Sequence, residues 1–123
     1  MSALRATGVE HVTITAPEEL EAEVIAWYRD VLGLEPVYKP PEAGMGGAWL
    51  QVGEQQVHIS IDPRNPPEEA HFCLVVDDFG GAVDALRKAG CHIEQASPIP
   101  GRRRFFTRDP AGNRVEIAAW GDG

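Results

Sequence analysis

The chain lacks the features expected of a membrane, nucleic-acid-binding or disulfide-stabilised protein. No apolar run approaches the roughly 20 residues needed to cross a bilayer, and no signal-peptide pattern is present, so we expect a cytoplasmic protein without membrane contact. The net charge is −8, and the only basic cluster is the run from 102 to 104, which argues against nucleic acid as a partner. The two cysteines, Cys73 and Cys91, have no metal or redox spacing, and we expect buried, reduced thiols.

The sequence predicts one domain over residues 1–123, built from two similar modules at about 8–62 and 68–120. The length of 123 residues is typical of a single domain with its own core. The Pro-rich stretch from 62 to 67 is the clearest connector. On either side of it, hydrophobic periodicity and turn signals predict the same order, β-α-β-β-β. The predicted strands are 9–15, 34–38, 48–52, 56–61, 71–76, 91–94, 104–107 and 114–118, and the predicted helices begin near Leu20 and Asp78 and end before Gly33 and Gly90.

These elements predict an α+β fold in which two βαβββ modules form a curved mixed sheet. A single helix covers only one face of a four-stranded sheet, so the other faces should curve around a shared cleft. We expect polar side chains to point into that cleft.

Four metal-competent side chains recur at related points of the two modules. His11 and His71 each open a strand and are 60 positions apart, while His58 and Glu116 lie within strands and are 58 positions apart. Because alternate residues of a strand share a face, each of the four lies opposite the large aliphatic residues of its strand, beside a small or polar neighbour. The pattern therefore predicts one metal site shared by both modules.

The donor types restrict the metal. Three imidazoles and a carboxylate without a thiolate suit one borderline divalent ion, such as Zn, Ni, Co, Fe or Mn. Taken singly, a strand histidine is more often an exposed or internally bonded polar group than a ligand. The prediction depends on three of the four histidines occupying repeat-related inward positions. His92 has no counterpart in the pattern, and we expect it at the surface.

The repeated βαβββ order, the early His-Val of module 1, the histidine that opens module 2 and the segment from Arg108 to Glu116 (RDPAGNRVE) resemble the vicinal oxygen chelate superfamily over residues 8–120. That group includes glyoxalase I, fosfomycin-resistance proteins, extradiol dioxygenases and bleomycin-resistance proteins. The resemblance implies a metal with open positions for a substrate that binds through two adjacent oxygens. It matches His11, His58, His71 and Glu116 to the four ligand positions. The position of His58 is normally a glutamate or glutamine in glyoxalase I, and this departure argues against that activity.

Two functions follow as expectations. The first is a metal-dependent lyase, isomerase, dioxygenase or transferase acting on a small molecule, with Glu116 as both ligand and catalytic proton carrier. The walls of the pocket could be formed by Trp49, Trp120, Met45 and Phe106. An anionic group of the substrate could contact Arg102, Arg103 or Arg104. The loop from Gly44 to Gly47 is either a lid or a connector. The second is a metal-free binding protein of the bleomycin-resistance type. For either function we expect a homodimer.

Overall fold

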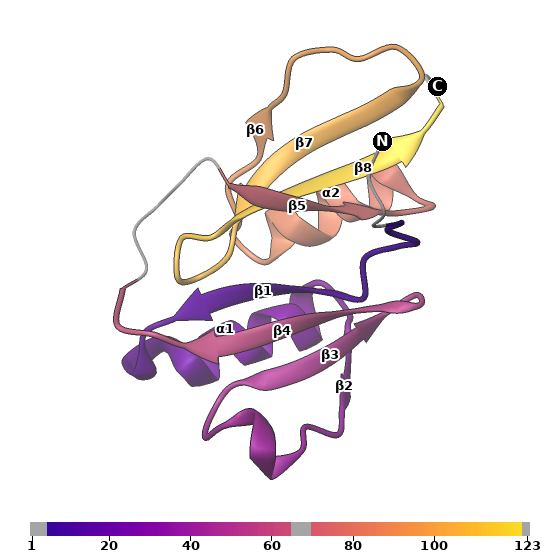
Figure 1. The fold of residues 1–123 in the computed structure, drawn as a ribbon. Coiled ribbons are helices and arrows are strands. Elements are labelled where there is room, and N and C mark those ends of the chain that lie inside the picture. The colour runs from indigo at the N-terminus through magenta and orange to yellow at the C-terminus, as the bar shows by residue number, and fades with distance from the viewer. Residues whose placement is uncertain (1–4, 65–69, 122–123) are drawn as a thin grey trace.

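Two modules of equal topology make up the fold (Figure 1). The structure, a computed structural model, describes residues 5–64 and 70–121. Module 1 contains β1 (His11–Ala16), η1 (Glu18–Leu20), α1 (Glu21–Ala26), η2 (Trp27–Val31), β2 (Glu35–Val37), η3 (Pro41–Ala43), β3 (Ala48–Val52) and β4 (Gln55–Ile61). Module 2 contains β5 (His71–Val75), α2 (Phe79–Lys88), β6 (Glu94–Gln95), β7 (Arg102–Arg108) and β8 (Arg114–Trp120). The predicted connector at 62–67 lies partly outside the described residues.

Each module forms its own four-stranded mixed sheet. The strand orders are β1-β4-β3-β2 and β5-β8-β7-β6, with one parallel pair in each (β1 with β4, β5 with β8) and antiparallel pairs elsewhere. The predicted α+β class and the repeated βαβββ order are confirmed. Between the modules, β1 and β5 line the same cavities without belonging to one sheet.

The large aliphatic residues of the central strands face the core, as their alternation with polar residues predicts. Val57 and Ile59 of β4, and Val115 and Ile117 of β8, are almost fully buried and pack in one cluster with Val24 of α1 and Leu86 of α2. The opposite face of each sheet, called here the helix-free face, carries His58 and Glu116. This division follows from the period of two in a strand.

Two predicted elements differ in detail. The expected helix after Leu20 is a short α-helix followed by the π-turn η2, which leaves both Trp27 and Tyr28 buried. The strand predicted at 91–94 shrinks to Glu94–Gln95. The reason is that the backbone N–H of Cys91 donates to the carbonyl of Leu86 and closes the end of α2, so it is not available to a sheet.

A buried polar contact joins the two modules on the helix side. The Tyr28 hydroxyl, next to α1, donates to Oδ2 of Asp109 in the β7–β8 turn at 2.9 Å. Asn113 donates from Nδ2 to the carbonyl of Thr15 in β1 at 2.9 Å and also to Asp109 at 2.8 Å. The Nε1 of Trp27 donates to the Cys91 sulfur at 3.2 Å. Module 1 is thereby tied to the turn and the helix end of module 2.

The environment of Asp109 suits a carboxylate that only accepts hydrogen bonds. Its oxygens receive the Tyr28 hydroxyl, the Asn113 amide group and the backbone N–H groups of Ala111 and Asn113. Burial raises the pKa of Asp109, and these hydrogen bonds oppose the rise. Burial, together with the neighbouring Asp109, also raises the pKa of Tyr28 well above its ordinary value.

The cysteines differ from the prediction in burial. Neither forms a disulfide, but Cys73 is exposed and Cys91 is half-buried. Cys73 points to the helix-free face of β5, where alternation places it beside Glu116 of β8.

In residues 5–64 and 70–121, no helix has the length and apolar character required to span a membrane.

The contact between the modules predicts a specific cost for losing one hydroxyl. Tyr28→Phe leaves Asp109 with one donor fewer in a buried site and should lower the free energy of unfolding by about 1–3 kcal/mol. Tyr38→Phe is the matched control, because Tyr38 is 78% exposed. The free energy of unfolding of this variant should stay within about 0.5 kcal/mol of the parent value. Urea unfolding of both variants measures the difference, and equal stabilities would contradict this role for Tyr28.

The loop before β3 predicts a second difference. Gly47 has φ 75°, and a Cβ there would lie 2.0 Å from the carbonyl oxygen of Ile59. Its N–H donates to Glu21 of α1 at 2.6 Å, so the loop is held to the helix at this point. Gly47→Ala should therefore destabilise the protein by more than the roughly 1–2 kcal/mol that a left-handed alanine costs. Thermal unfolding of both variants measures the difference. Gly44→Ala, at φ 104° with open space around it, should lose only the stability that a left-handed backbone conformation costs an alanine.

Candidate functional site

The module 1 ligand candidates form a stack of aromatic rings. His11 begins β1, and His58 lies in the adjacent β4 opposite Thr13, so both side chains reach the helix-free face. The two imidazoles are parallel, with ring centroids 4.0 Å apart. On its other side, His58 stacks on Trp49 of β3 at 4.1 Å. His58 is thus enclosed between two rings and is 8% exposed.

Polar neighbours orient both histidines of this His11–His58 pair. The Nε2 of His58 lies 2.8 Å from Oε1 of Gln56, so the tautomer of His58 that carries its proton on Nε2 donates a hydrogen bond to this amide oxygen. The Nδ1 of His11 lies 3.0 Å from the exposed carboxylate of Glu10. Burial, followed by the proximity of His11, lowers the pKa of His58 and favours its neutral form, which is the form that binds metals.

The module 2 candidates form a hydrogen-bonded His71–Glu116 pair. His71 begins β5 and donates from Nε2 to Oε1 of Glu116 in β8 at 3.0 Å. The second carboxylate oxygen of Glu116 accepts from Nη1 of Arg104 in β7 at 3.4 Å. Glu116 is 6% exposed, and the ring of Phe106 meets His71 edge-on at 5.0 Å. A buried carboxylate is therefore held between an imidazole and a guanidinium.

The two pairs have equivalent aromatic neighbours. Trp49 is the cross-strand partner of His58, and Phe106 is the cross-strand partner of Glu116. Both were predicted as possible wall residues, and both lie against a candidate ligand. The other two predicted wall residues are exposed at the surface, Met45 at 99% and Trp120 at 68%. His92 is exposed, as predicted.

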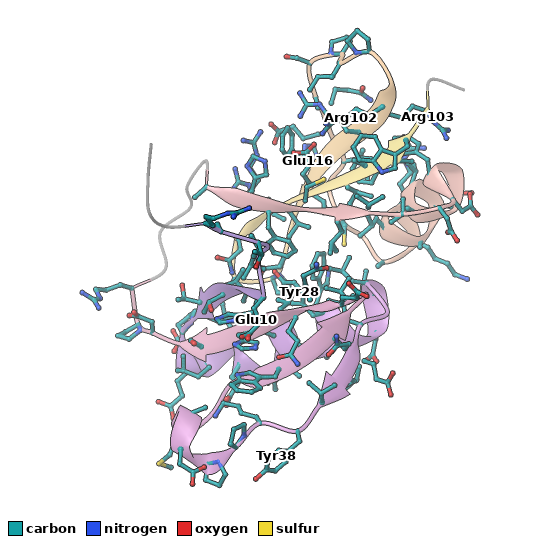
Figure 2. All side chains as sticks on the ribbon, turned by 45° about the vertical axis from the view of Figure 1, so that its right-hand side comes forward. Glu10, Tyr28, Tyr38, Arg102, Arg103 and Glu116 are labelled. Carbon is teal, nitrogen blue, oxygen red and sulfur yellow. The ribbon has the colours of Figure 1, made fainter. Side chains whose placement is uncertain are left out.

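The structure brings the four candidate ligands together two by two. Each module supplies one pair, and in residues 5–64 and 70–121 of a single chain no group of three or more His, Cys, Asp or Glu side chains is placed to hold a metal ion. Figure 2 shows Glu116 on the sheet of module 2 and Glu10, the partner of His11, on module 1. A single site containing all four residues stays a prediction.

The chemistry of each pair fits a metal to a different degree. Donors about 2.0–2.2 Å from one cation and adjacent in its coordination shell lie roughly 3 Å apart. The 3.0 Å between His71 Nε2 and Glu116 Oε1 meets this spacing, and metal binding at Nε2 requires loss of the proton that it donates to Glu116. In the His11–His58 pair the parallel rings direct their nitrogen lone pairs side by side. One imidazole there must turn out of the stack before both can bind one ion.

Both pairs border open space between β1 and β5. A cavity of about 420 Å³ is lined by His11, Gln56 and Cys73 among others. A second, of about 340 Å³, is lined by His71, Asn113 and Arg114 among others. Each pair therefore contributes one histidine to a space in which a small molecule fits.

The sequence reasoning missed Gln56 and Arg114, and it named Arg104 only as a possible contact for an anionic group. Gln56 bonds His58, Arg104 bonds Glu116, and Arg114 lies over the Phe106 ring at 3.6 Å. The predicted strand began only at 104. The strand register places Arg102, Arg104 and Arg108 of β7 on the face that carries Glu116.

The Cys73 thiol reports the electrostatics of this face. Burial, reinforced by Glu116, raises its pKa to about 11, and Arg102 and Arg104 act in the opposite direction. In the metal-free protein this pKa favours the protonated thiol at neutral pH.

Known proteins share this fold, with sequence identities of up to 31% among the structures described below. Residues 8–117 match the Glyoxalase/Bleomycin resistance protein/Dioxygenase superfamily. A structure from Bacillus anthracis, described as a glyoxalase family protein, is 31% identical, with a TM-score of 0.88, and the match covers 97% of this chain and 99% of that one.

More distant structures share the fold and differ in what they bind. The fosfomycin resistance protein FosX from Listeria monocytogenes, solved with Mn(II) and sulfate, is 12% identical with a TM-score of 0.74, covering 94% of this chain and 92% of that one. An antibiotic-binding protein from a Streptomyces species is 19% identical with a TM-score of 0.74, covering 96% of this chain and 99% of that one.

Proposed function

Because the chain belongs to the glyoxalase/bleomycin resistance/dioxygenase superfamily, we propose that it is a divalent-metal-dependent enzyme acting on a small molecule with two adjacent oxygens. The observation that carries this proposal is the His71–Glu116 pair, in which a buried carboxylate lies 3.0 Å from the Nε2 of an exposed imidazole, the spacing of neighbouring ligands of one cation. The FosX structure, which contains Mn(II), shows that a protein of this fold holds such an ion. Lyase, isomerase, dioxygenase and transferase reactions are all compatible with this donor set.

The metal would be held by His11 and His58 together with His71 and Glu116. Two donors alone do not retain a divalent ion, which takes four to six ligands in proteins. Within one chain the modules are fixed to each other through Tyr28, Asp109 and Asn113. We therefore propose that two chains form a homodimer in which the His11–His58 pair of one meets the His71–Glu116 pair of its partner. Open cavities beside both pairs leave room for this approach.

The protein residues around the ion divide the remaining tasks. A bound divalent cation would supply Lewis acidity to the substrate oxygens. Glu116 is the only carboxylate of the four, and we assign it the role of proton carrier as well as ligand. Gln56, bonded to His58, and Arg104, bonded to Glu116, fix the orientation of those two side chains. Trp49 stacks on His58 and Phe106 meets His71 edge-on, so an aromatic ring lies against each pair.

A metal-free binding protein is the second candidate, and one observation favours it. The parallel stack of His11, His58 and Trp49 offers a flat aromatic surface. Such a surface suits a planar ligand, and an antibiotic-binding protein shares this fold. The buried Glu116 favours the enzyme, because a buried carboxylate that served only binding of an apolar ring would carry a desolvation cost.

Metal content distinguishes the two functions. Protein purified without added ions should contain close to one divalent ion per chain, measured by plasma mass spectrometry. His58→Ala and Glu116→Ala should each weaken metal binding by about 10-fold or more, because removing a ligand leaves the ion under-coordinated. His92→Ala is the matched control and should keep the full metal content, since His92 is exposed.

Equal metal retention in all three variants would reject the ligand assignment. Metal-free parent protein that binds flat aromatic drugs, with loss of binding in Trp49→Ala, would instead support the binding function.

A further inference from the structure

The helix-free face of module 2 is strongly cationic. Along β7, Arg102, Arg104 and Arg108 alternate on this face, and Arg114 of β8 lies directly opposite Arg108. All four are partly buried. Glu116 and His71 belong to the same face, because the register pairs Phe106 with Glu116 and His71 with Arg114.

Two ion pairs lie on this face. Arg104 pairs with Glu116, and Arg114 pairs with Glu94. Arg108 and Arg114 are cross-strand partners, and like charges directly opposite each other destabilise a sheet. The face therefore brings guanidinium groups closer together than sheet stability favours.

Arg104 is a largely buried guanidinium whose hydrogen bonds are incomplete within the described residues. Its side chain is only 14% exposed, yet its contact with Glu116 is 3.4 Å, well beyond the 2.7–2.9 Å typical of a charge-assisted hydrogen bond. Its Nη2 donates to the carbonyl of Ser97 at 2.9 Å, and its buried Nε has no hydrogen-bond partner within the described part of the chain. A buried donor in this state costs free energy that an incoming acceptor would recover.

We propose that Arg104, flanked by Arg102, forms an oxyanion subsite that binds a carboxylate, phosphonate or phosphate group of the substrate. The two side chains belong together because residues two apart on β7 share the helix-free face, and Arg104 also contacts Glu116. The planar guanidinium presents paired N–H donors that match two oxygens of such a group. This names the substrate class of the proposed enzyme and, to that extent, rests on the proposed function.

The contact between Arg104 and Glu116 gives the subsite a characteristic response. In the structure the Glu116 carboxylate occupies one donor of Arg104, so a ligand oxyanion must compete with it. Neutralising Glu116 should therefore strengthen anion binding. The same change should weaken metal binding, so the two sites respond in opposite directions to one substitution.

Calorimetric titration of chelator-treated, metal-free protein tests the subsite without involving the metal. Inorganic phosphate and acetate, titrated separately at low ionic strength, represent the two sources of oxyanion, and the tighter of the two identifies the substrate group. Arg104→Gln should weaken binding of the preferred ion by about tenfold or more. Arg104→Lys keeps the charge but loses the paired donors, so its affinity for the preferred ion should lie between those of the parent and of Arg104→Gln.

The controls separate a specific subsite from general attraction. Arg87→Gln removes the same charge from the exposed face of α2 and should leave phosphate and acetate binding unchanged. Glu116→Gln should bind the preferred ion more tightly than the parent. Unchanged anion affinity in a folded Arg104→Gln protein would overturn the proposal. So would a loss of anion affinity in Arg87→Gln equal to that in Arg104→Gln, or a lower anion affinity in Glu116→Gln than in the parent.

Different measurements test the oxyanion subsite and the metal-dependent function, so one can be rejected without the other. The anion titration uses metal-free protein, and the metal measurements described above use no added anion. Loss of anion binding with normal metal content would reject the subsite alone, while absence of metal with intact anion binding would reject only the metal enzyme.

Discussion

The buried contact between Tyr28 and Asp109 determines how the two modules face each other. Asp109 accepts from a helix-side residue of module 1 and from its own turn, and Asn113 extends the contact to β1. Because these groups are buried, breaking them would leave polar atoms without water or partners. The modules therefore act as one body. The His11–His58 and His71–Glu116 pairs keep the separation that this body imposes, and this constraint is why we propose a second chain to complete the metal site.

Much of the fold follows from local rules that the sequence displays. Val57 and Ile59 alternate with His58, and Val115 and Ile117 alternate with Glu116, which is enough to assign faces. The glycine at 90 and the turn from Asp109 to Asn113 mark the ends of α2 and β7. The π-turn at Trp27 was not predictable, because it depends on burying both Trp27 and Tyr28 against module 2. The loss of strand at Cys91 likewise depends on a helix-closing hydrogen bond.

The sequence was sufficient to select the four candidate residues, but not to predict how they are arranged relative to one another. Repeat spacing selected His11, His58, His71 and Glu116, and the structure places each on the helix-free face of its sheet. Spacing contains no information on how the modules are oriented, so it did not separate one shared site from two pairs. It also did not reveal that Gln56 and Arg104 already bond two of the candidates. The aromatic and cationic character of the two faces emerges only from strand register.

The central claim is that each chain carries two half-sites and that a metal is held only where chains meet. Mixing His58→Ala protein with Glu116→Ala protein, each with little metal of its own, tests this most directly. If the site lies between chains, half of the dimers become mixed after subunit exchange, and each mixed dimer regains one intact site. Metal content should then recover to about one quarter of the parent value per chain. No recovery, in a mixture shown to exchange subunits, would contradict a shared site.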